Sequence, residues 1–209
     1  MKINLAKIRL PGFFAKQKKE LLSSGLIMLA ICASCALVLS GLSSLLSPQI
    51  EKNATAALMS AMQRVLPADE YVNTGFENKE EDKVVSVYEA RSGETLLGYC
   101  VEATADDYGE EMRVCVAVDT EDKVIAVEII SISGKDSTVS KVKDSSFLSQ
   151  FVGKSGNITA VRGIAKADTQ VSEVSEASAS SKAVAECVNR AVAAVSQIEA
   201  EKAKEAAGL

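Results

Sequence analysis

The chain has 209 residues, which is enough for one ordinary globular domain and little more. Hydrophobic residues make up 47% and charged residues 24%, and this balance excludes a disordered or collagen-like chain. The sequence contains no histidine. A histidine-based catalytic triad, a histidine metal site and a histidine-ligated haem are therefore excluded.

The net charge of -5 is unevenly distributed along the chain. The first twenty residues carry six bases and one acid, so the acidic excess lies entirely in the remainder. A nucleic-acid-binding domain needs a basic face on the folded part of the protein. Because the positive charge lies on a terminal tail instead, we expect no nucleic-acid partner.

An apolar block follows this tail, with no charged residue from position 21 to position 50. About 20 apolar residues span a bilayer, so we predict a transmembrane helix over residues 21–46 and a basic cytoplasmic tail over 1–20. The positive-inside rule places the rest of the chain outside the cytoplasm. A cleaved signal peptide would have an apolar core of only about 7–15 residues. The sequence therefore predicts an uncleaved, single-pass anchor in the cell membrane.

The residues after the anchor predict a juxtamembrane helix and linker over 47–79, a domain over 80–200 and a polar tail over 201–209. Apolar residues between 57 and 66 recur at helical spacing and end at Pro67. Four alternating or apolar runs follow, at 83–90, 96–103, 112–118 and 124–132, and they predict an antiparallel meander. Residues 145–151 predict a short helix that ends at Gly153. We expect residues 154–178 to form a mostly exposed loop with one short strand near 160–164.

The last long segment predicts the clearest helix outside the membrane. Apolar residues repeat there at three- and four-residue steps, namely Val184, Cys187, Val188, Ala191, Val192, Val195 and Ile198. Ser178 stands just before this helix, where it can act as an N-cap. A helix N-terminus also binds phosphate readily through its free N–H groups. The predicted fold class is therefore α+β, with an antiparallel sheet and a long C-terminal helix.

Five cysteines are present, and two of them lie in a predicted hairpin. If the turn is centred between Asp107 and Tyr108, Cys100 and Cys115 are directly opposite each other. Cross-strand neighbours come close enough for a disulfide, which an extracytoplasmic location would permit. The alternative is a pair of buried thiols, as is common for free cysteine. Cys187 lies on the apolar face of the last helix and is predicted to be a core residue.

The order of these segments resembles a known family. The matching pieces are Arg64–Pro67 (RVLP), Gly98-Tyr99, Tyr108-Gly109, Ser146–Phe151 and Ser175–Val184 (SEASASSKAV). From about residue 21 to residue 198 the chain looks like the G subunit of Rnf electron-transport complexes and the C subunit of sodium-pumping NADH:quinone oxidoreductases. The resemblance implies an extracytoplasmic FMN-binding-type domain.

In that family FMN is joined through its phosphate to a threonine in a segment reading roughly D-x-x-S-G-A-T-x-S-S. The resemblance assigns the attachment to Ser178, with Ala177 before it. The further cofactor-binding candidates are Ser175, Ser180, Ser181 and Lys182. The segment departs from the family at three positions, with Ser172 for the aspartate, Glu176 for the glycine and Ser178 for the threonine. A second family stretch, S-H-S-E-T-P-G-L-G, aligns with residues 131–139, which read SISGKDSTV here.

The resemblance implies an electron-carrier subunit of a redox-driven ion translocase, an Rnf-type ferredoxin:NAD oxidoreductase, with no catalysis by the subunit alone. Its implied partners are the other membrane subunits of an Rnf- or Nqr-type complex, and a flavin transferase for maturation. Two alternatives stay open at this point. One is a flavin-less structural subunit of the same kind of complex, and the other is an anchored extracytoplasmic binding module.

Overall fold

In the computed structural model, the structure describes residues 27–29, 31–37, 40, 53–76, 83–107, 110–132 and 139–207. The chain divides into two compact units, 1–53 and 54–209, and each is described here by itself. The predicted basic tail and most of the predicted anchor lie outside the described residues, as do the tip at 108–109 and residues 133–138 of the second family stretch.

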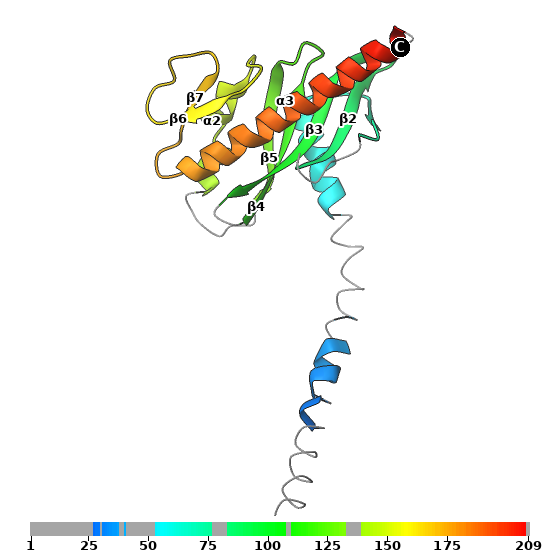
Figure 1. Ribbon diagram of the computed structural model, residues 1–209, viewed down its shortest axis with the longest axis vertical. Helices are drawn as coiled ribbons and strands as arrows, with labels where there is room; N and C mark the ends of the chain where they lie inside the picture. The colour runs from blue at the N-terminus through cyan, green and yellow to red at the C-terminus, as the bar shows by residue number, and fades with distance from the viewer. Residues whose placement is uncertain are drawn as a thin grey trace, which may run out of the picture. The chain divides into compact units, whose positions relative to one another are not determined.

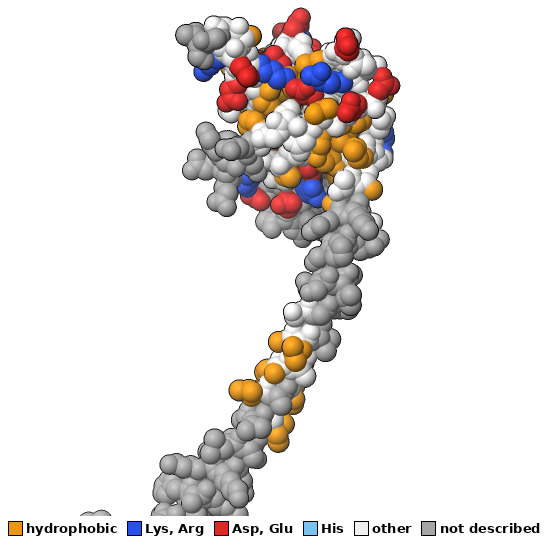
Figure 2. Space-filling model, turned by 90° about the vertical axis from the view of Figure 1, so that its right-hand side faces the viewer, with side chains coloured by type: hydrophobic (Ala, Val, Ile, Leu, Met, Phe, Trp, Pro, Cys, Tyr) orange, Lys and Arg blue, Asp and Glu red, His pale blue; other side chains and the backbone are white. Residues whose placement is uncertain are grey.

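The described part of the first unit is helical and apolar. Its large side chains are exposed over 57–74% of their surface, namely Ile27, Met28, Leu29, Ile31 and Leu37 (Figure 2). Among the residues that the structure describes, no helix is both long and apolar enough to cross a membrane. The transmembrane helix over 21–46 therefore stays a prediction.

The second unit is built on a five-stranded antiparallel sheet (Figure 1). Its strands follow one another in the order of the chain: β1 (Glu70–Asn73), β2 (Val84–Ser92), β3 (Thr95–Asp107), β4 (Glu110–Val118) and β5 (Val124–Ile132). The predicted meander is confirmed, because β2 to β5 cover the four runs recognised in the sequence. The structure adds β1, an edge strand within the segment predicted as a linker.

One helix covers each face of the sheet. Helix α3 (Ser178–Ala206) lies diagonally across one face (Figure 1), where every second residue of β3 is buried against it: Tyr99, Val101, Ala103 and Ala105. The helix at 53–65 packs on the other face, where Leu58, Met62 and Val65 join a second buried cluster. The helix predicted ahead of Pro67 is confirmed over residues 53–65, whereas its position next to a membrane stays a prediction. Alternation along each strand thus supplies two apolar faces, one for each helix.

A smaller region follows β5 and leads to α3. It contains the 3-10 turn η1 (Val139–Lys143), the short helix α2 (Ser145–Leu148), the 3-10 turn η2 (Ser149–Phe151) and two parallel strands, β6 (Thr159–Val161) and β7 (Gln170–Ser172). The predicted helix at 145–151 is confirmed, with Gly153 at φ +75° behind it. The expectation of a single strand between 154 and 178 is wrong, because a three-residue stretch at 170–172 pairs with β6.

Side chains hold this smaller region in place. The side chain of Asn189 in α3 accepts a hydrogen bond from the Ile158 N–H (2.7 Å) and donates one to the Ile158 carbonyl (2.8 Å). Gln150 makes the same pair of bonds with the backbone of Ser172 (2.7 and 3.4 Å). These side-chain clasps, formed by Asn189 and Gln150, make the backbone hydrogen bonds that a neighbouring strand would otherwise make.

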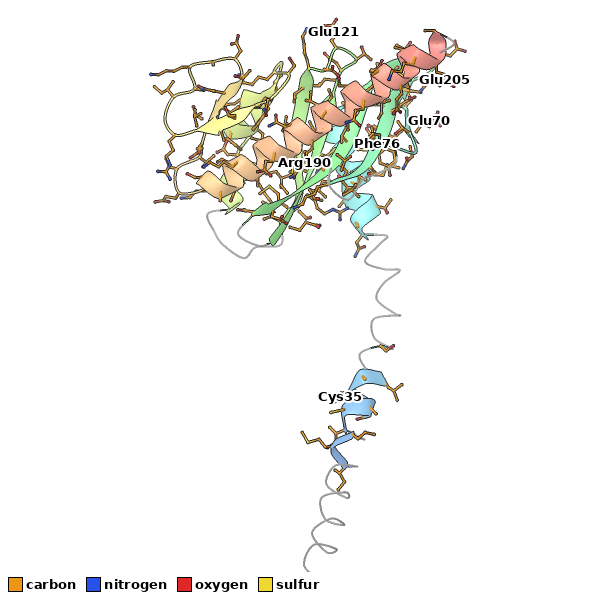
Figure 3. The ribbon with its side chains drawn as sticks, in the orientation of Figure 1. Cys35, Glu70, Phe76, Glu121, Arg190 and Glu205 are labelled. Carbon is orange, nitrogen blue, oxygen red and sulfur yellow. The ribbon has the colours of Figure 1, made fainter. Side chains whose placement is uncertain are left out.

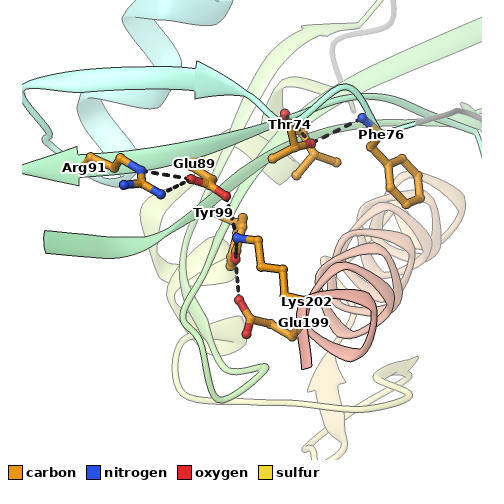
Figure 4. A network of polar contacts seen from close by, with 8 residues as sticks. Thr74, Phe76, Glu89, Arg91, Tyr99, Glu199 and Lys202 are labelled. Carbon is orange, nitrogen blue, oxygen red and sulfur yellow. Dashed lines mark hydrogen bonds and ion pairs between the residues drawn. The ribbon is translucent and has the colours of Figure 1, made fainter. Parts of the chain in front are cut away.

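The C-terminal end of α3 is fastened to the sheet by a polar network (Figure 4). Lys202 donates to Glu89 (2.5 Å) and to the Tyr99 hydroxyl (2.6 Å), and its ammonium lies 4.9 Å from the centre of the Tyr99 ring. The Tyr99 hydroxyl donates in turn to Glu199, and Arg91 donates two bonds to Glu89. Burial raises the pKa of Glu89, but the hydrogen bonds from Lys202 and Arg91 outweigh it and hold that pKa below its ordinary value.

The two hairpin cysteines are free thiols on the buried face beneath the helix at 53–65. Cys100 is opposite Ala117 and Cys115 is opposite Glu102, so the cysteines are diagonal rather than direct neighbours. The predicted turn centre was wrong by one residue, since the last pair before the turn is Asp107 with Glu110. The buried-thiol alternative is confirmed, and Cys187 is a core residue as predicted.

Candidate functional site

At the start of α3, three backbone N–H groups have no hydrogen-bond acceptor among the described residues. Ala177, at φ -130°, is the residue that precedes the helix, and it provides no side-chain cap. The Ser181 N–H donates to the Ala177 carbonyl (2.9 Å). Within the described residues, the N–H groups of Ser178, Ala179 and Ser180 meet no acceptor. Such groups at the N-terminus of a long helix favour an anion.

The prediction that Ser178 caps this helix is therefore wrong. Ser178 is already the first helical residue, and the cap position belongs to Ala177, whose side chain has no acceptor. The N–H of Ser181, a cofactor-binding candidate from the sequence, is not free for a phosphate, because the first helical hydrogen bond uses it. The free donors begin three residues earlier, at Ser178.

The four serines around this turn differ sharply in what their hydroxyls do. Ser180 is 1% exposed and donates to the Asp107 carboxylate (2.6 Å). Ser181 is fully buried, donates to the Ala177 carbonyl (2.8 Å) and accepts from the Val174 N–H (3.0 Å). Ser178 is half-buried and Ser175 is exposed, and neither hydroxyl has a hydrogen-bond partner among the described residues. Only Ser178 and Ser175 are thus available to a modifying enzyme.

Glu176 has the backbone conformation that a glycine would adopt. Its φ is +67°, in the left-handed region where residues with a Cβ are strained. Its carboxylate is exposed and pairs with Lys141 of η1. The hydrogen bond and charge of Lys141 hold the pKa of Glu176 below its ordinary value. The position that the resemblance aligns with the family glycine therefore keeps a glycine-type turn, although the residue has changed.

Two buried carboxylates flank this first turn. Asp107, at the end of β3, is 4% exposed, and its Oδ1 atom accepts no hydrogen bond from any described residue. Glu173, just after β7, has a side chain that is 5% exposed, and its Oε2 atom likewise lacks a hydrogen bond among the described residues. Buried acceptors without donors are rare in folded proteins. Asp107 and Glu173 thus each keep one carboxylate oxygen with unused acceptor capacity beside the start of α3.

Lys182 and Arg162 approach only Glu173. Their nitrogens lie 3.8 and 3.7 Å from its carboxylate, and both side chains are mostly exposed. Lys182, a cofactor-binding candidate from the sequence, is thus close to a carboxylate of the protein itself. No Lys or Arg of the described chain forms an ion pair with Asp107.

The structure gathers all six predicted site residues in one turn and its approach, from Ser175 to Lys182. Sequence reasoning missed Asp107 and used it only to locate the centre of the hairpin turn. Alternation along β3 was the signal that could have found it, since Asp107 continues the buried series that runs through Ala103 and Ala105, whereas Asp106 points outward and pairs with Lys83. Lys141 and Glu173 carried no recognisable sequence signal.

A separate groove of about 660 Å³ lies beside the middle of α3. Its walls come from the β4–β5 turn, the loop at 155–157 and α3 residues around Arg190. Figure 3 labels Glu121 of that turn and Arg190. None of the predicted site residues lines it. Within the described part of the chain, no group of acidic or cysteine side chains is arranged to hold a metal ion.

Comparisons with known proteins bear on the same region. Residues 107–193 match the family of FMN-binding domains. Among solved structures, the crystal structure of NqrC from Shewanella oneidensis is similar at 16% identity and a TM-score of 0.46, over 55% of this chain. The chain spans 61% of the length of that structure. No functionally curated protein matches the chain.

The matched segment begins at the buried carboxylate of Asp107 and includes Ser178 with the whole first turn of α3. The family expectation drawn from the sequence is confirmed at this level. The match of residues 107–193 makes this part of the chain similar to the FMN-binding domain family.

Proposed function

We propose that this protein is a membrane-anchored electron-transfer subunit that carries FMN, tethered by a phosphoester to Ser178, in an Rnf- or Nqr-type complex. The family match supports FMN as the ligand. The tether rests on the surroundings of Ser178, which is half-buried at the first position of α3. Neither its hydroxyl nor the N–H groups of Ser178, Ala179 and Ser180 have a hydrogen-bond partner among the described residues.

The residues present fit an FMN phosphate ester. The free N–H groups of the first turn would bind the phosphate oxygens, and the helix dipole would favour their charge. The glycine-type turn at Glu176 keeps the backbone route of the family motif. The buried oxygens of Asp107 and Glu173 offer acceptors to the hydroxyl and imide donors of a flavin.

When bound, FMN supplies one- and two-electron transfer, and the protein positions it and tunes its electrostatics. The side chains of this domain therefore need to make no bond after attachment. Electron transfer between neighbouring subunits, coupled to ion movement, is the activity that the family resemblance supports for the whole complex.

The membrane location forms part of the same proposal. An uncharged stretch of thirty residues follows a basic tail, and its described residues are helical with exposed apolar side chains. We expect residues 54–209 to lie outside the cytoplasm. Protease added to intact cells stripped of any outer barrier should then degrade this unit, whereas protection until the membrane is lysed would contradict the orientation.

The tether is tested by the intact mass of the full-length protein purified from its native membrane, with in-gel flavin fluorescence after denaturation. We expect the mass of one FMN ester and fluorescence in the wild type and in Ser175→Ala, and loss of both in Ser178→Ala. Ser175→Ala is the matched control because the Ser175 hydroxyl, like that of Ser178, has no hydrogen-bond partner among the described residues. Flavin retained in Ser178→Ala would contradict this attachment site.

A flavin-less structural subunit is the second candidate, and the Glu176–Lys141 pair favours it. The pair places a carboxylate beside the candidate phosphate position and occupies a nearby cation. An unmodified mass, with no flavin released on denaturation, would support this candidate. Flavin that co-purifies and is released on denaturation would instead mean binding without a tether.

A further inference from the structure

The carboxylate of Asp107 is almost fully buried, and its two oxygens differ in their hydrogen bonding. The Oδ2 atom accepts a hydrogen bond from the Ser180 hydroxyl, and this bond joins β3 to α3. The other oxygen is buried without a donor among the described residues. A buried carboxylate without full hydrogen bonding is costly, and no described cation pairs with it. The N-terminal dipole of α3 is the compensating charge in reach.

The hydrogen bond from Ser180 places the Asp107 carboxylate beside the first turn of α3. Ser180, which holds Asp107, also contributes one of the three free N–H groups. An anionic group bound there would place the next atoms of its ligand beside a buried acceptor. A ligand that binds both the N–H groups of α3 and the Asp107 oxygen must have an anionic end followed by hydrogen-bond donors. FMN has that order, with a phosphate, then ribityl hydroxyls, then the isoalloxazine ring.

We propose that Asp107 is a positioning residue of the flavin site, which accepts a hydrogen bond from the ribityl chain and lowers the reduction potential of the bound flavin. The inference rests on the proposed function above. A fixed negative charge in a low-dielectric region opposes the addition of electrons to a nearby group. Glu173 acts more weakly in the same sense, because Arg162 and Lys182 offset its charge.

Three variants separate this role from simple fastening of β3 to α3. Asp107→Asn removes the charge and keeps an oxygen that can accept from Ser180. Asp106→Asn is the matched control, because Asp106 is adjacent in sequence, has a side chain 68% exposed and faces Lys83. Ser180→Ala removes the hydrogen-bond donor that partly neutralises Asp107, so it should change the reduction potential of the flavin in the opposite direction.

The measurement is a spectroelectrochemical titration of the flavin in the full-length protein purified from its native membrane, together with a thermal melt. We expect Asp107→Asn to raise the potential, so that the reduced-to-oxidised ratio at a fixed potential rises about tenfold, which is 29.6 mV for a two-electron couple. Asp106→Asn should shift the potential much less, and Ser180→Ala should lower it. If Asp107→Asn fails to fold, the direction in which Ser180→Ala shifts the potential tests the proposal, and a rise in potential would contradict it.

Equal potentials in the wild type, Asp107→Asn and Ser180→Ala would overturn this inference while leaving the proposed function intact. A lower melting temperature without a change of potential would show that Asp107 only fastens β3 to α3. A wild-type protein with no flavin, bound or tethered, would overturn both the proposed function and the role of Asp107.

Discussion

Replacing Asn189 by alanine should loosen the smaller region that carries the approach to α3. The Asn189 carboxamide both accepts from and donates to the backbone of Ile158, whose side chain is 1% exposed, and it donates a longer bond of 3.2 Å to Asn157. The alanine variant leaves the Ile158 N–H and carbonyl without these partners.

The magnitude follows from these bonds. An unsatisfied buried N–H costs about 1–3 kcal/mol, and the loss of the second backbone bond adds about 0.5–1.5 kcal/mol. Alanine is the better helix former, which returns about 0.5 kcal/mol or somewhat more. We therefore expect Asn189→Ala to lower the free energy of unfolding by about 2 kcal/mol. For a unit of this size, that corresponds to a fall in Tm of about 4–8 °C.

Thermal unfolding followed by circular dichroism measures this loss, and hydrogen exchange at the Ile158 amide shows whether it is local. The matched control is Asn157→Ala, which removes only the exposed 3.2 Å bond and should change Tm by about 1 °C or less. Equal melting temperatures for the two variants, with unchanged exchange at Ile158, would refute the reasoning.

Three further outcomes are expected. Glu176→Gly should increase the flavin-bearing fraction seen by intact mass, because glycine adopts φ +67° without strain and removes the carboxylate beside Ser178; an unchanged or smaller fraction would contradict this. The folded-state pKa of Glu89 is lowered, so its stabilisation is present above the ordinary value of 4.5 and disappears as pH falls through the lowered pKa. Glu89→Gln should therefore melt below the wild type at pH 7, with a gap that closes in acid; a gap independent of pH would argue against the ion pairs. Burial raises the pKa of Cys187 to about 12, so iodoacetamide at pH 8 should leave this thiol unmodified until denaturant is added, and native labelling at the unfolded rate would disprove its burial.

The main sheet and α3 could be predicted because their patterns are long and regular. Alternation along β3 and β4 and the three- and four-residue steps of α3 each follow from burial on one face. β1 was not predicted because it is an edge strand with mostly exposed side chains. It is a strand because its backbone pairs with β2, and its sequence has no alternation of buried and exposed residues. β7 has only three residues and depends on pairing with β6.

At the candidate site, the start of the last helix could be predicted, but the contacts of its residues could not. The motif placed Ser178 correctly at the start of a helix, since four family positions map onto consecutive residues there. It could not show that Ser180 and Ser181 are buried and engaged, because that depends on contacts with β3 and with the preceding loop. The diagonal placement of Cys100 and Cys115 depended on the exact turn, where a shift of one residue in the turn centre moves each cross-strand partner by two.

The side-chain clasps of the smaller region have a consequence for how this protein can change over evolution. Gln150 and Asn189 hold the backbone at Ser172 and Ile158 by hydrogen bonds that lie outside the five-stranded sheet. Substitutions between β7 and α3 can therefore accumulate while the register of the sheet stays intact. A family motif can then drift at Ser172, Glu176 and Ser178 within an unaltered scaffold, and a lineage can gain, weaken or lose its cofactor without having to rebuild its fold.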